Sequence, residues 1–237
     1  MIPLIFYNIF ILFLCVSVGL FTVRTIFKKA RKDKESISFA WYLFLILVIF
    51  FFDGVRLLCI YFGYFQIDKI LFYGLFTISP IAIFPSLYHL VLKISFQEKL
   101  ARIIGFAAFF IMVIIVIFMF KDGVRGPIIT DWGSQYFLLG IGAYILNIGF
   151  LVKYSIIIYD LVARIRSWIK NKKIVDSYRW STSLTMFIIC SILGIGVTGF
   201  FQAGWQMFLT RILLLIAILI NYLSYTSEEV ITKFEKL

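Results

Sequence analysis

The chain has 237 residues, of which 62% are hydrophobic, 19% are aromatic and only 15% are charged, and its net charge at pH 7 is +11. A soluble domain is about 45–50% apolar and about 25% charged, so a soluble domain of this length could not hide so much apolar surface. The composition therefore excludes a soluble globular protein and predicts an all-α, polytopic integral membrane protein.

Seven apolar segments are long enough to cross a bilayer, because a transmembrane helix needs about 20 apolar residues. Together they predict a seven-helix transmembrane domain over residues 1–225, followed by a short cytoplasmic tail over 226–237. The predicted helices cover roughly residues 2–23, 38–62, 69–93, 103–120, 136–158, 181–201 and 205–225.

The connections between these segments differ strongly in positive charge. Residues 24–37, 93–102, 153–180 and the tail hold eighteen Lys and Arg, whereas the alternate connections hold three. Because cytoplasmic loops are enriched in Lys and Arg, this difference predicts an outside N-terminus and a cytoplasmic C-terminus. A bacterial cytoplasmic (inner) membrane is the default expectation. The basic excess is then explained by anionic lipid headgroups at the cytoplasmic face, and no nucleic-acid partner is expected.

Two charges interrupt the apolar run FFDGVRLLCIYF at residues 51–62. At 1.5 Å per residue, Asp53 lies about 4–5 Å and Arg56 about 9 Å outside the midplane, and Arg211 of the seventh segment lies about 6–7 Å outside it. A charge at the bilayer centre costs at least about 2.5–3.5 kcal/mol, and pairing lowers that cost. We therefore expect Asp53 to pair with Arg56, Arg211 or both.

Two cations and one carboxylate leave a positive surplus in this predicted cluster. Asp131 of the outer connection could balance the surplus, or the surplus could hold an anionic group of a small ligand. Gln202, Trp205 and Gln206 lie at a similar depth and are candidates for the wall of such a pocket. The alternative is purely structural, because aromatic residues are enriched at membrane interfaces and Arg56 could extend outward to the headgroups.

A second polar set, His89, Asn147 and Asn221, lies in or near the cytoplasmic half of the predicted spans. A single histidine in such a position acts more often as an interhelical hydrogen-bond partner than as a proton carrier. These three residues could also extend a polar path inward from the outer cluster.

Motifs for catalysis, cofactors and metals are not expected in this chain. It has one histidine and three isolated cysteines, which give no metal-ligand pattern. GIGVTG at residues 194–199 matches a dinucleotide-binding pattern in letters only, because no strand precedes it. We therefore predict a non-enzymatic protein without cofactor or metal.

Residues 154–180 are expected to continue the fifth helix beyond the bilayer as a basic amphipathic helix. Such a helix binds a membrane surface or a protein partner. Asp160 and Asp176 are expected to be solvated or paired with Arg164 and Arg179. The basic residues of this helix are Arg164, Arg166, Lys170, Lys172 and Lys173.

The third segment, FYGLFTISPIAIFPSLYHLVLK at residues 72–93, resembles a pattern in the seven-helix N-terminal membrane sensor region of bacterial histidine kinases. In that pattern an aromatic residue and glycine are followed by a proline in mid-helix and by further aromatic residues. The chain stops about where the kinase module would begin, so the resemblance implies a sensor or accessory module that signals through another chain. No catalytic residue is implied.

These observations favour a non-enzymatic seven-helix sensor or accessory module with an outward-facing polar pocket. Its expected partners are the bilayer, another protein and possible small anionic ligands. Two alternatives remain open at this point. One is a transporter or channel for a small solute, and the other is a structural subunit of a larger membrane complex.

Overall fold

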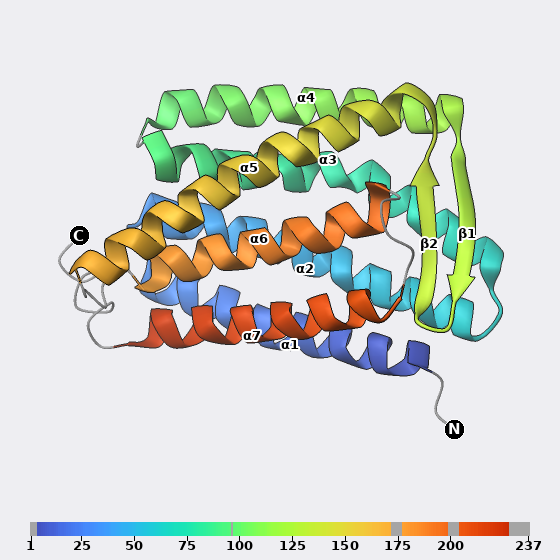
Figure 1. Cartoon of the computed structure of the whole chain (residues 1–237), viewed down its shortest axis with the longest axis horizontal. Coiled ribbons are helices and arrows are strands. Elements are labelled where there is room, and N and C mark those ends of the chain that lie inside the picture. Colours follow the sequence, from blue (N-terminus) through green and yellow to red (C-terminus); the bar gives the residue numbers. More distant parts are fainter. Residues whose placement is uncertain (1–3, 96, 172–176, 199–203, 228–237) are drawn as a thin grey trace.

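The computed structural model describes residues 4–95, 97–171, 177–198 and 204–227. Within those residues the chain forms seven α-helices and one two-stranded antiparallel sheet (Figure 1). The elements are α1 Leu4–Lys29, α2 Lys34–Tyr61, α3 Phe65–Ser95, α4 Glu98–Asp122, β1 Val124–Thr130, β2 Gly133–Leu138, α5 Gly140–Asn171, α6 Ser177–Thr198 and α7 Trp205–Thr226.

Each helix overlaps one of the apolar segments. Six of them, all except α6, are long and apolar enough to cross a membrane. The described apolar part of α6, Arg179–Leu193, is shorter than a full span. The structure therefore confirms the helical, membrane-compatible fold class that the composition predicts.

The helices form a closed ring, in which each one packs against its neighbours in sequence and α7 packs against α1. Consecutive helices run in opposite directions, so the first residue of α1 and the last residue of α7 lie at opposite ends of the bundle (Figure 1). The contact between α4 and α5 is the least extensive in the ring. Short connections and sequential neighbours are the usual arrangement of antiparallel helix bundles.

Local signals define both ends of α2. Asp33 accepts a hydrogen bond from the backbone N–H of Ser36 at 3.1 Å and so caps the N-terminus. At the other end Gly63 has a φ of 80°, and the N–H of Tyr64 donates to the carbonyl of Cys59 at 2.7 Å. This Schellman-type closure favours glycine because the left-handed conformation strains other residues. The chain can therefore reverse directly into α3.

A β-hairpin covers one end of the bundle, where the sequence analysis expected a loop and the start of the fifth helix. β1 and β2 pair antiparallel, with Thr130 opposite Gly133 across a two-residue turn. β2 packs against α2 and α6, and five of its six residues are buried. The fifth helix consequently begins at Gly140 and not at residue 136.

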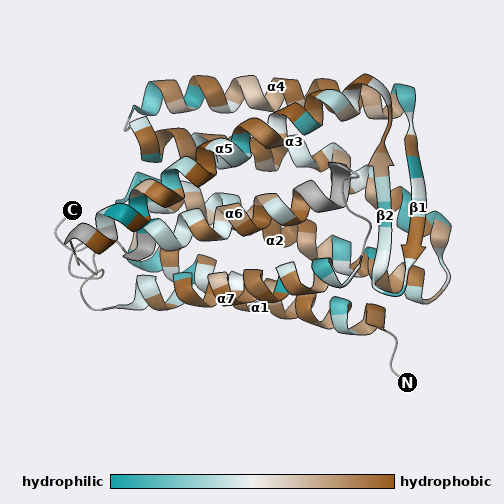
Figure 2. Ribbon diagram, in the orientation of Figure 1, coloured by the Kyte–Doolittle hydropathy of each residue, from teal (hydrophilic) through white to brown (hydrophobic). Residues whose placement is uncertain are grey.

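The outer surface of the ring is apolar. Large side chains such as Phe10, Phe21, Phe110, Ile117 and Leu151 are exposed around it. Figure 2 shows this hydrophobic colouring along the lengths of the helices, with hydrophilic residues more frequent towards their ends. An apolar surface of this extent needs a hydrocarbon environment, which indicates a membrane location.

Candidate functional site

Asp53 joins two arginines at the end of the bundle covered by the hairpin. Its Oδ1 lies 3.0 Å from Nη1 of Arg56, one helical turn further along α2, and its Oδ2 lies 2.8 Å from Nη2 of Arg211 on α7. Arg211 is only 2% exposed. These are the residues that the sequence analysis expected to meet, and Arg56 points into the bundle and not outward to the headgroups.

Asp68, in the first turn of α3, completes this group. Its Oδ1 accepts a hydrogen bond from Nε of Arg56 at 3.0 Å, and its Oδ2 accepts one from the hydroxyl of Tyr136 at 2.7 Å. Asp68 is fully buried. We call Asp53, Arg56, Asp68, Tyr136 and Arg211 the hairpin-end cluster.

The two carboxylates of the hairpin-end cluster balance its two guanidinium groups. The expected positive surplus is therefore absent within the cluster. Asp131 does not balance it, because this residue is exposed on the hairpin turn, whereas Asp68 is buried against Arg56. Sequence reasoning missed Asp68 because it precedes the predicted third span by one residue and was treated as part of a connection.

The hairpin holds the cluster through β2. The guanidinium of Arg56 lies 5.2 Å from the ring centroid of Phe72 and 5.3 Å from that of Tyr136, and its Nη2 donates to Ser134 Oγ at 3.3 Å. Burial raises the pKa of the Tyr136 hydroxyl, and its hydrogen bond to Asp68 acts in the same direction. Tyr136 therefore stays protonated and remains a hydrogen-bond donor to Asp68.

The other residues proposed for the outer pocket do not join the hairpin-end cluster. Trp205 is exposed and Gln206 is half-buried at the start of α7, and neither lines the cavity described below. Gln202 lies outside the described residues. Arg211 does line the cavity, and its Nε and Nη1 have no hydrogen-bond acceptor among the described residues.

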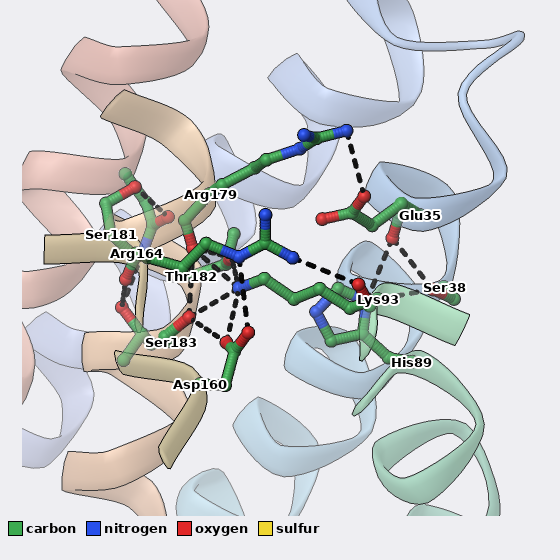
Figure 3. A network of polar contacts seen from close by, with 12 residues as sticks. Glu35, Ser38, His89, Lys93, Asp160, Arg164, Arg179, Ser181, Thr182 and Ser183 are labelled. Carbon is green, nitrogen blue, oxygen red and sulfur yellow. Dashed lines mark hydrogen bonds and ion pairs between the residues drawn. The ribbon is translucent and has the colours of Figure 1, made fainter. Parts of the chain in front are cut away.

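A second buried network, drawn in Figure 3, lies near the start of α2. Glu35 of this network and Asp53 are eighteen residues apart on α2, or about 27 Å at 1.5 Å per residue. Lys93 of α3 is at the centre of the network and is fully buried. Its Nζ lies 3.1 Å from Oδ2 of Asp160 on α5 and donates to the carbonyl of Arg179 at 2.6 Å on α6. It also donates to Ser183 and, at 3.0 Å, to Thr182.

The same network includes charges from α2 and α5. Asp160 Oδ1 lies 3.2 Å from Nε of Arg164, and Arg179 lies 3.5 Å from Glu35. Ser183 Oγ donates to Asp160 at 2.5 Å. We call Glu35, Lys93, Asp160, Arg164, Arg179 and Ser183 the basic-end network.

The basic-end network changes the expectation for two residues of the basic helix. Asp160 pairs with Arg164 as expected, but it is buried and not solvated, because Lys93 and Ser183 enclose it. Arg164 is directed into this network, whereas Arg166 is exposed. Asp176, Lys172 and Lys173 and the side chain of Lys170 lie outside the described part of the chain.

The predicted inner polar set is not brought together. His89 is buried, with its Nδ1 3.0 Å from the carbonyl of Glu35 and 2.9 Å from Ser38 Oγ, so it links α3 to α2. Asn221 links α7 to α6 through Ser181. Asn147 is half-buried on α5 and contacts neither of the other two through a hydrogen bond between described residues. Their separation favours structural interhelical bonding over a continuous polar path.

A cavity of about 510 Å³ lies inside the ring between the two charged groups. Asp53, Arg56 and Arg211 line it at the hairpin end, and Tyr42 and Lys153 line it further along the bundle. The α2 residues that line the cavity run from Tyr42 to Leu57, which is about 22 Å along the helix. Most of its wall consists of apolar side chains from α2, α3, α4 and α5. Its size and its few polar groups are typical of small-molecule sites, which measure about 300–1,000 Å³.

Lys153 belongs both to the predicted fifth span, 136–158, and to the basic connection, 153–180. The structure places it on α5, where it is 6% exposed. Its Nζ lies 5.4 Å from the ring centroid of Tyr42. Its position inside the apolar run 136–158 was the signal that could have identified it as an intramembrane cation.

Comparisons with known proteins do not assign a function. No protein-family model, no curated protein and no solved structure matches the chain. Among the residues that the structure describes, no group of three or more His, Cys, Asp or Glu side chains is placed to hold a metal ion. The cavity and the charged residues that line it are therefore the basis for the functional assignment.

Proposed function

We propose that this protein is a non-enzymatic, seven-helix membrane sensor or accessory module that holds a small ligand in its central cavity. The observation that carries the proposal is the cavity itself, which lies inside the ring and contacts the donor groups of Arg211. The expected polar, outward-facing pocket is replaced here by a mainly apolar internal site with a polar wall at the hairpin end.

The orientation belongs to the same proposal. The N-terminus lies outside and the C-terminus in the cytoplasm of a bacterial inner membrane, with the hairpin on the outer face. The strong excess of Lys and Arg in the connections at the opposite end supports this orientation. The basic end then lies against anionic headgroups, and α5 extends beyond the bilayer towards a protein partner.

Signalling would use the helices that line the cavity. α2 joins the hairpin-end cluster to the basic-end network, because it carries both Asp53 and Glu35. α5 carries Lys153 in the cavity wall and Asp160 two turns further on. A ligand that prefers one packing of these helices shifts the population of that packing, and the change reaches the partner chain through the basic end. The partner supplies the output, as the resemblance to sensor regions implies.

The test uses two matched glycine variants of the full chain. A Cβ at Gly149, in the cavity wall, or at Gly74, which lies on α3 outside it, would meet no atom within 4 Å. We expect a small molecule to copurify with the native chain in mild detergent, to be lost from Gly149→Phe and to be kept by Gly74→Phe. Native mass spectrometry measures its occupancy. Equal occupancy in both variants would contradict a ligand in this cavity.

A solute transporter is a second candidate, and one observation favours it. Ion pairs form one end of the cavity and lie beyond the other, where they could act as gates that open alternately to each side of the membrane. Uptake of the copurified molecule into proteoliposomes separates the two functions. Flux that Gly149→Phe abolishes supports transport, whereas binding without flux supports the sensor.

A further inference from the structure

Lys153 differs from the other buried basic residues in having no anion beside it among the residues that the structure describes. Arg56, Lys93 and Arg211 are equally buried, and each pairs with an aspartate. Across the described residues, no carboxylate and no hydrogen-bond acceptor pairs with Lys153; its Nζ faces the Tyr42 ring, and the Cys190 thiol of α6 is the other titratable group near it. Burying a lone ammonium costs several kcal/mol, so a bound anion would remove a large part of that cost.

The walls around Lys153 are unsuited to a small hydrophilic anion. Beyond Lys153 and Tyr42, the cavity is lined mainly by apolar residues until it reaches the hairpin-end cluster. A phosphate or carboxylate ion alone would leave the apolar surface of the cavity uncovered. An alkyl chain attached to the anion would bury them, which is favourable in proportion to the apolar area covered.

The cavity also has an opening on the side of the bundle, between α4 and α5. Ile111 of α4 and Val152 of α5 line the cavity, yet they are 50% and 55% exposed. The two helices are close near the hairpin, where a Cβ at Gly142 would lie 3.1 Å from Phe118. They diverge towards the basic end (Figure 1). In a membrane this opening faces the lipid chains, so an amphiphile can enter sideways.

We propose that the cavity binds a single-chain amphiphile whose anionic head, a carboxylate or a phosphate, pairs with Lys153. The alkyl chain occupies the apolar part of the cavity between α3, α4 and α5. Arg211 is a weaker candidate for the head because Asp53 already neutralises it. This inference rests on the proposed role of the cavity as a ligand site, and it adds the chemical class of the ligand.

Binding of three probes with the same chain length tests the inference. Hexadecanoate, hexadecyl phosphate and hexadecanol are titrated into the full chain in nanodiscs of neutral lipid. We expect the native chain to bind at least one anion about tenfold more tightly than the alcohol, which corresponds to about 1.4 kcal/mol for one ion pair. The tighter of the two anions identifies the head group as carboxylate or phosphate.

Substitutions at Lys153 then locate the head group. Lys153→Met should reduce the preference for the anion to within about twofold and leave the affinity for hexadecanol unchanged, whereas Lys153→Arg should keep the preference. Lys69→Met is the matched control, because Lys69 is exposed and lies outside the cavity wall. This control should bind all three probes as the native chain does.

The outcomes separate this inference from the proposed function. Equal affinity of the native chain for alcohol and anions, or an unchanged preference in Lys153→Met, overturns the anionic amphiphile but leaves the cavity as a ligand site. Failure of all three probes to bind the native chain also overturns the inference. The copurified ligand and its loss in Gly149→Phe test the cavity independently of these probes.

Discussion

Asp68 decides the charge balance of the hairpin-end cluster. With Asp53 alone, Arg56 and Arg211 would leave one buried positive charge, and a bound anion would be needed. Asp68 supplies the second carboxylate, and Tyr136 donates to its other oxygen. The buried cation without a carboxylate partner among the described residues is consequently Lys153 and not an arginine of this cluster.

Removing the charge of Asp68 should destabilise the protein strongly. Breaking one side of a buried ion pair costs about 3–5 kcal/mol because the other charge stays buried without compensation. We therefore expect Asp68→Asn to lower the free energy of unfolding by an amount of this order, measured by denaturant titration in mild detergent. Asp131→Asn is the control, since Asp131 is exposed on the hairpin turn, and it should change stability by less than about 0.5 kcal/mol. Equal effects of the two variants would disprove the role of Asp68.

Among the elements, the β-hairpin was the one that the sequence analysis missed. Its two strands contain the β-favouring runs IIT and YFL, separated by the residues of a tight turn. The apolar residues of the second strand continue directly into the fifth helix, so the hydropathy of the region reads as a single span. The buried contacts of β2 with α2 and α6 decide in favour of a strand, and these contacts exist only in the folded bundle.

The basic-end network ties α3, α5 and α6 together through one carboxylate. Asp160 contacts both Lys93 and Arg164, so Asp160→Asn leaves two cations close together and should lower the free energy of unfolding by about 3–5 kcal/mol. Adding Lys93→Met removes one of these cations. We expect the second substitution to restore about 0.5–3 kcal/mol of the free energy of unfolding that Asp160→Asn loses, because the effects of residues in contact are not additive.

A lysine outside the network serves as the control for this cycle. Lys99 is exposed at the same end of the bundle, so Lys99→Met should restore nothing in the Asp160→Asn background. If Lys93→Met lowers stability further in that background, Lys93 stabilises these helices by packing and not by pairing with Asp160. The same unfolding titration in mild detergent measures every variant.

For the whole molecule, the closed ring and the uneven charge of its two ends lead to a test of orientation. A cysteine at Asp131, in the hairpin turn, should react with a membrane-impermeant maleimide in intact cells. A cysteine at Lys32, in the connection between α1 and α2, should react only after the membrane is permeabilised. Both positions are exposed. The native chain measures the background from Cys15, Cys59 and Cys190.

The two labels also report on the number of crossings between these positions. Labelling of position 32 in intact cells, with position 131 labelled only after permeabilisation, would reverse the proposed orientation. Labelling of both positions from the same side would show that an even number of spans separates them, which contradicts three intervening crossings by α2, α3 and α4. Either result would remove the basis for placing the basic end in the cytoplasm.

The sequence by itself determined that this is a helical protein with an apolar, membrane-compatible surface, and each of its seven apolar segments overlaps one of the described helices. It also predicted that Asp53 would meet Arg56 and Arg211. These properties depend on the length of apolar runs and on depth along a helix, both of which can be counted along the chain. They do not require knowledge of which helices are neighbours.

Only the tertiary structure decided that Asp68 and not Asp131 balances the arginines, that Asp160 is buried, and that Lys153 faces a cavity. Each of these outcomes depends on the rotation of a helix about its axis and on the side chains that the adjacent helices present. In a chain this apolar, almost every helix face can meet lipid, so hydropathy cannot show which face turns inward. Packing around the ring selects that face, and it thereby places Lys153 in a mainly apolar cavity with no carboxylate beside it in the described part of the chain.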